Sequence, residues 1–182
     1  MKNTLFILLS FLVLAGYAQE SYTLSKESVL KINGSSTIHD WTVTANAMEG
    51  SMSMNDGALK DLLFKVAVAQ IKSERGAAMD KKMHAALKME EHPNVTFKLQ
   101  EIKKSTGSEN TFQIHGLLTI AGAEQAVDIT LEFQESGGNY VFKGSKEIKL
   151  QDYDMEPPTA MFGQIIVGDN VTIDFDLVFA KG

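Results

Sequence analysis

The sequence contains no cysteine in 182 residues. The protein therefore has no disulfide bond and no cysteine nucleophile, and it lacks the residue on which a bacterial lipoprotein carries its lipid. Its stability must come from its core. Apart from the N-terminus, no stretch approaches the roughly 20 consecutive apolar residues that a membrane-spanning helix needs. We therefore expect a soluble mature protein without stable membrane insertion.

Positive charge is also scarce, because 17 Lys and Arg stand against 23 Asp and Glu and give a formal net charge of −6. A nucleic-acid-binding protein normally shows a basic patch or stripe. The charge balance thus argues against a nucleic-acid partner and against docking on an anionic lipid surface. The acidic residues of the expected wet faces, such as Asp128 and Asp174, are interpreted as solubilising.

Motifs that mark catalytic or nucleotide-binding sites are missing as well. The sequence has no GxSxG, no GxGxxG and no phosphate-binding loop. The four histidines, His39, His84, His92 and His115, show no HExxH or other ligand spacing. We therefore expect no catalytic residue, no metal site and no cofactor other than a bound lipid.

What is present begins with an export signal. A short basic start, Met1-Lys2, precedes the almost unbroken apolar run at residues 5–14 and the small-residue cleavage signal Gly16-Tyr17-Ala18. This pattern predicts a secretory signal peptide over residues 1–18. Residues 19–182 then have the size of a single domain, and we expect this domain in a bacterial periplasm or outside the cell.

Most of the remaining chain alternates apolar and polar residues with the period of two that marks half-buried strands. Asn55-Asp56-Gly57 predicts a tight hairpin turn, whereas Gly34-Ser35-Ser36 is interpreted as a strand break. Short polar turns between such segments predict an antiparallel all-β fold, and a sandwich or a closed barrel would bury its dry face. The expected strands are 22–24, 29–32, 39–54, 62–71, 94–102, 111–120, 127–134, 140–148 and 171–179.

One stretch has a helical rather than a strand-like period. Met79, Met83 and Leu87 fall at positions i, i+4 and i+8, which places them on one stripe of a helix. Pro93 ends the pattern. We predict one helical insertion around 77–90 that closes one end of the barrel with a soft, Met-rich surface.

Five segments carry a family resemblance through their order and spacing across nearly the whole mature chain. They are residues 34–41 (GSSTIHDW), 71–80, 92–97 (HPNVTF), 116–122 (GLLTIAG) and 157–173. Together they resemble the YceI-like family of exported lipid-binding proteins. The resemblance implies an elongated, lipocalin-like antiparallel β-barrel of about eight strands, with a deep apolar channel for an isoprenoid chain or similar lipid tail. It supplies no catalytic residue.

The inward-facing positions are the predicted ligand-binding residues. Any one of them is better explained by a filled core, because most inward residues of a small barrel only pack, but the Met-rich irregular segments favour a cavity for the group. An apolar channel binds a tail through about 0.8 kcal/mol per buried CH₂ and needs no directional contact. The predicted walls are Trp41, Phe64, Val66, Phe97, Phe112, Ile114, Leu118, Ile129, Leu131, Phe142, Phe175 and Leu177, with Met79, Met83 and Leu87 as a lid and Met155, Met161 and Phe162 as a second flexible wall.

The sequence thus predicts an exported carrier of a hydrophobic small molecule. An isoprenoid lipid or quinone-like compound is the first candidate ligand, and a fatty acid or amide is the second. One alternative is a barrel enzyme that acts on a lipidic substrate, with His39 and Asp40 as acid–base groups. Another is a stress-related structural or partner-binding protein with a filled interior. The sequence leaves a homodimer open.

Overall fold

The structure is a computed structural model that describes residues 20–104 and 110–182. The predicted signal peptide at residues 1–18 lies outside the described residues, as does most of the polar loop expected between the strands at 94–102 and 111–120. In chain order the elements are β1 (Glu20–Leu24), β2 (Val29–Ser36), β3 (Asp40–Ala45), β4 (Met48–Asn55), β5 (Ala58–Ala67), the 3-10 helix η1 (Val68–Gln70), β6 (Ile71–Ser73), α1 (Ala77–Ala86), β7 (Asn94–Lys104), β8 (Thr111–Ile120), β9 (Ala123–Ser136), β10 (Asn139–Lys149), the 3-10 helix η2 (Leu150–Tyr153), β11 (Thr159–Ala160) and β12 (Ile165–Lys181).

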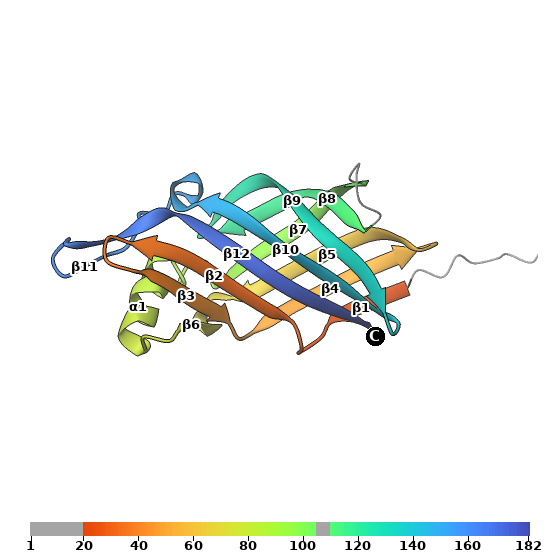
Figure 1. Cartoon of the computed structure of the whole chain (residues 1–182), viewed down its shortest axis with the longest axis horizontal. Coiled ribbons are helices and arrows are strands. Elements are labelled where there is room, and N and C mark those ends of the chain that lie inside the picture. Colours follow the sequence, from red (N-terminus) through yellow and green to blue (C-terminus); the bar gives the residue numbers. More distant parts are fainter. Residues whose placement is uncertain (1–19, 105–109) are drawn as a thin grey trace, which may run out of the picture.

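Antiparallel pairing closes the strands into a barrel. Around the ring the order is β1-β4-β5-β7-β8-β9-β10-β12, and β12 pairs again with β1. Tyr22 of β1 lies opposite Met52 of β4 on one side and Lys181 of β12 on the other. The long strands run obliquely along an elongated body (Figure 1). This closure confirms the predicted all-β, eight-stranded antiparallel barrel, and it removes the sheet edges of that part of the barrel.

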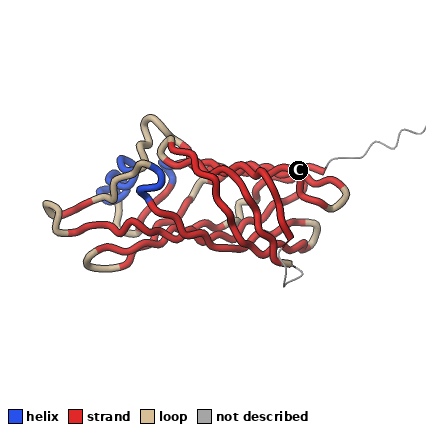
Figure 2. Tube along the Cα trace, turned by 90° about the horizontal axis from the view of Figure 1, so that it is seen from above, coloured by secondary structure: helices blue, strands red, loops and turns tan. Residues whose placement is uncertain are grey.

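The ring is split at its other end, between β6 and β7. There β12 pairs with β2 instead of β1, β2 pairs with β3, and β3 pairs with β6, where the strand order stops. The pairing of β5 with β7 ends at Ala67 and Asn94. Figure 2 shows the helical segments gathered at this end, away from the C-terminus. The helix α1 therefore lies where backbone hydrogen bonds leave the wall unclosed.

Three expectations about individual elements are wrong. The strand expected over residues 39–54 is two strands, because the chain leaves one part of the wall after Ala45: β3 pairs with β2 and β6, whereas β4 pairs with β1 and β5. The strand β2 does not break at Gly34 but continues to Ser36, and the indole of Trp41 lies over Gly34, 2.2 Å from where a Cβ would stand. The strand expected over residues 62–71 stops at Ala67, because residues 68–70 form the 3-10 helix η1. The predicted helical insertion is confirmed, and α1 itself ends at Ala86.

The hairpin at Asn55-Asp56-Gly57 is confirmed. It joins β4 to β5, with Asn55 opposite Ala58. Asp56 and Gly57 have φ values of 51° and 73°, the left-handed conformation that a two-residue hairpin turn requires.

The closed end of the barrel is filled by six aromatic rings, which we call the aromatic plug: Tyr22, Phe112, Phe133, Tyr140, Phe142 and Phe179. Phe133 stacks on Tyr140 with the ring centroids 5.2 Å apart, and Phe142 meets Phe179 edge-on at 5.5 Å. Phe179 is 0% exposed. Offset and edge-on geometries of this kind stabilise aromatic pairs beyond their buried area, so this end is solid core.

Replacement of Phe179 by alanine should destabilise the protein by about 3–5 kcal/mol, because it removes a fully buried ring from the aromatic plug and leaves a void there. Urea denaturation would measure the loss. Leu63→Ala is the control, since Leu63 is half exposed on the outside of β5 and should change the unfolding free energy by no more than about 0.5 kcal/mol. Equal effects of the two changes would contradict the assignment of the aromatic plug as core.

Candidate functional site

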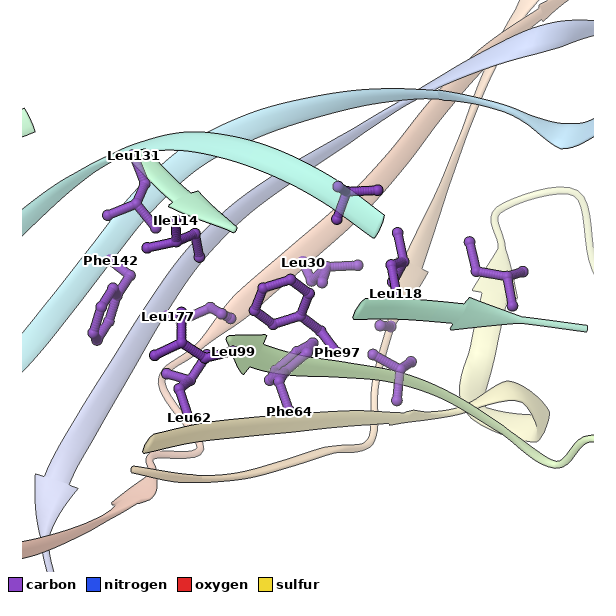
Figure 3. Close-up of a cluster of buried hydrophobic side chains, with 14 of the residues drawn as sticks. Leu30, Leu62, Phe64, Phe97, Leu99, Ile114, Leu118, Leu131, Phe142 and Leu177 are labelled. Atoms are coloured by element: carbon purple, nitrogen blue, oxygen red, sulfur yellow. The ribbon is translucent and has the colours of Figure 1, made fainter. Parts of the chain in front are cut away.

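An apolar cavity with a volume of about 270 Å³ occupies the half of the barrel next to α1. Residues of β2, β3, β5 to β10 and β12 line it, together with α1 and the segment that follows β10. Figure 3 shows apolar side chains, among them Leu30, Phe64, Phe97 and Leu118, pointing from different strands into this shared interior. The volume is far larger than the roughly 10–15 Å³ that one water needs, so this half of the barrel is hollow.

All but three of the predicted wall and lid residues line this cavity. Whether they contact a ligand stays a prediction. The predicted residues that the structure places on the cavity are Trp41, Phe64, Val66, Met79, Met83, Leu87, Phe97, Ile114, Leu118, Ile129, Leu131, Phe142, Met155, Phe175 and Leu177.

The helix α1 presents one face to the cavity and anchors another to β6. Met79, Met83 and Ala86 line the cavity. On the adjacent face Asp80 and His84 are buried, although both are polar. The amide of Ser73 in β6 donates to Asp80 Oδ1 at 2.8 Å, and His84 Nε2 lies 2.9 Å from the carbonyl oxygen of Ile71, to which it donates. These bonds satisfy two backbone groups at the unclosed edge of β6.

The anchor at β6 also sets the protonation of Asp80. The hydrogen bond from the Ser73 amide, assisted by the positive charge of Lys72, holds the pKa of the Asp80 carboxyl below its usual value. Sequence reasoning missed this pair. The signal for it was present, because an acid and a histidine at positions i and i+4 share one face of a helix.

Basic and neutral polar groups also line the cavity, whose mouth lies beside α1, where Arg75 and Lys82 stand. These polar groups are Ser36, His39, Thr42, Ser73, Arg75, Lys82, Lys146 and Thr159. None of the described residues that line the cavity is Asp or Glu. The mouth thus differs in charge from the protein as a whole, whose net charge is −6.

Two lysines reach across the mouth from α1 and the turn after it. Lys82 Nζ donates to the carbonyl of Thr159 at 3.4 Å, and Lys88 Nζ donates to the carbonyl of Asp154 at 3.2 Å. Both bonds are exposed to solvent. Such long, solvated hydrogen bonds contribute little net stability, so α1 is held much more firmly to β6 than to the opposite side of the mouth.

The single tryptophan of the chain stands at the same opening. Trp41 lines the cavity, lies over Gly34, and donates its indole N–H to the carbonyl of Ser35 at 3.0 Å. Its fluorescence therefore reports on the cavity and on its mouth.

A family model described as the YceI-like domain matches residues 22–179. This chain belongs to the YceI-like family. The match spans every strand that encloses the cavity, so the resemblance seen in the sequence is confirmed. No curated protein matches the sequence.

Solved structures share this YceI-like fold at low sequence identity. A polyisoprenoid-binding domain from Saccharophagus degradans, implicated in plant cell wall breakdown, is similar with a TM-score of 0.72 and 15% identity, over 90% of this chain and 99% of that one. BcnA from Burkholderia cenocepacia is similar with a TM-score of 0.69 and 19% identity, over 84% of this chain and 96% of that one. A YCEI protein from Campylobacter jejuni is similar with a TM-score of 0.63 and 16% identity, over 77% and 84% of the two chains.

Three residues predicted to line the channel of this YceI-like domain lie outside the cavity. Phe112 has the inward parity of Ile114 but stands one step nearer the closed end, where it packs edge-on against Phe133 in the aromatic plug. Met161 and Phe162 are exposed, at 63% and 108%, in the turn between β11 and β12. Both residues have positive φ values, 51° and 57°, in this turn.

The histidine and carboxylate side chains that could form an acid–base pair or a metal site do not gather in one place. His39 lines the cavity with its Nδ1 3.3 Å from Ser36 Oγ, whereas Asp40 is exposed and does not line it. His115 lies on the wet face, as predicted, and pairs with Asp128 at 3.0 Å. Within residues 20–104 and 110–182, no three His, Cys, Asp or Glu side chains gather closely enough to hold a metal ion.

None of the helices in the described part of the chain combines the length and apolar character needed to span a membrane.

The stabilising effect of Asp80 should depend on pH. Because the pKa of Asp80 is lowered in the folded protein, its contribution is complete above the usual value of 3.8 and is lost as the pH falls through the lower folded value. Asp80→Asn should therefore be less stable than the parent at neutral pH, and the difference should shrink in acid. Chemical denaturation at several pH values would measure it.

Glu74→Gln removes the same charge from the exposed loop before α1 and is the matched control for this prediction. It should leave the stability nearly unchanged at every pH. A stability loss in Asp80→Asn that stays constant from neutral pH into acid would show that the carboxylate charge does not anchor α1.

Proposed function

We propose that this protein is exported and sequesters or carries a long-chain apolar molecule inside its barrel. An isoprenoid lipid or a quinone-like compound is the first candidate, and a fatty acid or amide is the second. The observation that carries the proposal is the apolar cavity, which lies between the α1 end of the barrel and the aromatic plug at the other end. The polyisoprenoid-binding domain that shares the fold supports the same class of ligand.

The apolar wall sets a minimum size for the ligand tail. Each methylene moved from water into the cavity contributes about 0.8 kcal/mol, so ten of them contribute about 8 kcal/mol. Association itself costs about 4–15 kcal/mol. Tight binding by apolar contact therefore requires a tail of well over ten carbons, which favours isoprenoid chains over short amphiphiles.

The mouth explains how a ligand would be oriented and admitted. The tail occupies the apolar end beneath the aromatic plug, and a polar head group stays at the mouth within reach of Ser36, His39 and Arg75. The ligand passes when α1 moves away from the carbonyls of Thr159 and Asp154, because these are its weakest attachments. Methionine side chains on the inner face of α1 adapt to tails of different shape.

We propose binding without turnover. The rival interpretation requires His39 and Asp40 to act together on a substrate. His39 faces the cavity, but the exposed Asp40 does not line it. A carrier needs neither group to transfer a proton.

Native mass spectrometry of the gently purified mature protein should show a lipid bound in a one-to-one complex. The bound lipid should be recovered unchanged after incubation. Conversion of that lipid by the parent protein, abolished in His39→Ala, would instead identify an enzyme. A protein that is empty and takes up no long-chain probe would contradict the carrier function.

A charge on the inner face of α1 should block uptake. Met83→Asp places a carboxylate against the apolar cavity and should weaken the binding of a long-chain lipid, measured by Trp41 fluorescence, by more than about tenfold, since burying an unpaired charge costs well over 1.4 kcal/mol. Ala85→Asp adds the same charge on the exposed face of the same helix and should bind nearly as the parent does. Equal weakening in both variants would remove the assignment of α1 as a lid.

A further inference from the structure

Exposed apolar side chains gather beside the cavity mouth. Ile38, Met161, Phe162 and Ile166 are each about half exposed or more; we call these four residues the hairpin-tip patch. Ile38 stands in the turn between β2 and β3, and the other three belong to the hairpin of β11 and β12. Contiguous apolar groups on the surface of a protein mark an interaction site more often than scattered ones do.

Hydrogen bonds hold the two hairpins side by side. The amide of Thr37 donates to the carbonyl of Ile166 at 3.0 Å, and its hydroxyl donates to the carbonyl of Gln164 at 3.2 Å. The amide of Ile166 donates back to the Thr37 hydroxyl at 3.3 Å. The four apolar side chains therefore belong to one surface rather than to two independent loops.

The sequence of both hairpins keeps this surface free of charge. Residues 32–39 and 157–168 contain no Lys, Arg, Asp or Glu, although charged residues make up 22% of the chain. Met161 and Phe162 hold the left-handed backbone conformation that bulky residues rarely adopt. An unfavourable backbone that exposes a phenylalanine completely is consistent with a functional role for the side chain.

The patch is continuous with the mouth of the cavity. Ser36 and His39 of the first hairpin and Thr159 and Ile165 of the second line the cavity, while the tips between them point outward. Figure 1 shows the β11 hairpin projecting beyond the barrel at the end that carries α1. A ligand that enters or leaves the cavity passes next to these tips.

Basic groups lie at the same opening. Arg75 and Lys82 lie beside it, Lys146 of β10 also lines the cavity, and no carboxylate is found among the described lining residues. Exposed apolar tips next to a cationic site are complementary to a bilayer that contains anionic lipids, since the tips can enter the head-group region while the cations attract its surface charge. The net charge of the whole chain is −6, a value that by itself predicts no docking on an anionic lipid surface. The residues beside the cavity are basic instead, so that prediction does not apply to this part of the surface.

We propose that the hairpin-tip patch is a membrane-docking surface. Phe162 and Met161 insert into the head-group region of an anionic bilayer, and the cavity mouth is thereby brought against the membrane so that a lipid tail passes between bilayer and barrel without crossing water. The use of docking for lipid transfer rests on the proposed function, but docking itself does not. Four side chains on projecting tips form a convex, narrow surface that suits a deformable bilayer better than the broad, complementary area that a stable protein interface buries.

Vesicle flotation tests the docking surface. The mature protein should float with vesicles of phosphatidylcholine and phosphatidylglycerol, and less with vesicles of phosphatidylcholine alone. The double variant Met161→Ser/Phe162→Ser should lose at least about fivefold in the bound fraction. Leu63→Ser, which removes a half-exposed apolar side chain from the barrel wall, should float as the parent does.

A second measurement separates docking from lipid binding. Uptake of a long-chain lipid from detergent micelles, followed by Trp41 fluorescence, should be the same in the double variant as in the parent, because neither residue lines the cavity. Transfer of the same lipid from vesicles should be slower in the double variant. This pair of results also shows that the variant is folded.

The other possible results distinguish membrane docking from lipid binding and from dimer formation. A parent protein that takes up lipid from micelles but does not float overturns the docking surface and leaves the carrier function intact. A parent that floats through Phe162 but takes up no lipid supports docking and contradicts the carrier function. If the parent is a dimer in solution and the double variant is a monomer, the patch binds a second copy of the chain, and the membrane assignment is wrong.

Discussion

Backbone pairing that closes this barrel at one end and leaves it split at the other is the constraint on which the rest of the structure depends. The strand β12 pairs with β1 near the C-terminus but with β2 further along, and the wall that continues from β2 stops at β6. Where the ring closes, inward side chains pack into the aromatic plug. Where it is split, the interior stays hollow and a short helix takes the place of the missing hydrogen-bonded neighbour.

The attachment of α1 follows from this split edge and determines how the cavity can open. Asp80 and His84 bond to backbone groups of β6 that no strand satisfies, and their burial makes those bonds strong. The bonds of Lys82 and Lys88 across the mouth are exposed and weak by comparison. A helix fixed along one side and loosely held along the other is suited to swing outward, and this asymmetry connects the fold to the proposed passage of a lipid.

The local distribution of charged and apolar side chains differs from what the composition of the whole chain suggests. The net charge is acidic, and an argument from that sum alone disfavours anionic surfaces. The cavity lining nevertheless includes Arg75 and Lys82, from α1 and the loop before it, and Lys146 from β10. Met161 and Phe162 are a similar case, because their apolar character suggested an inner wall, whereas the turn geometry directs them outward.

The sequence by itself determined the all-β class, the antiparallel barrel, the helical insertion and most of the cavity wall, because strand parity and helical period are local properties that successive residues display directly. It did not determine where along the barrel each inward residue falls. Phe112 and Ile114 have the same parity in β8, yet one belongs to the aromatic plug and the other to the cavity. That difference depends on the register of strands far apart in the chain, as do the split between β6 and β7 and the burial of Asp80 and His84. Only the tertiary structure decided these features, since they arise from pairing between segments whose relative positions no local pattern encodes.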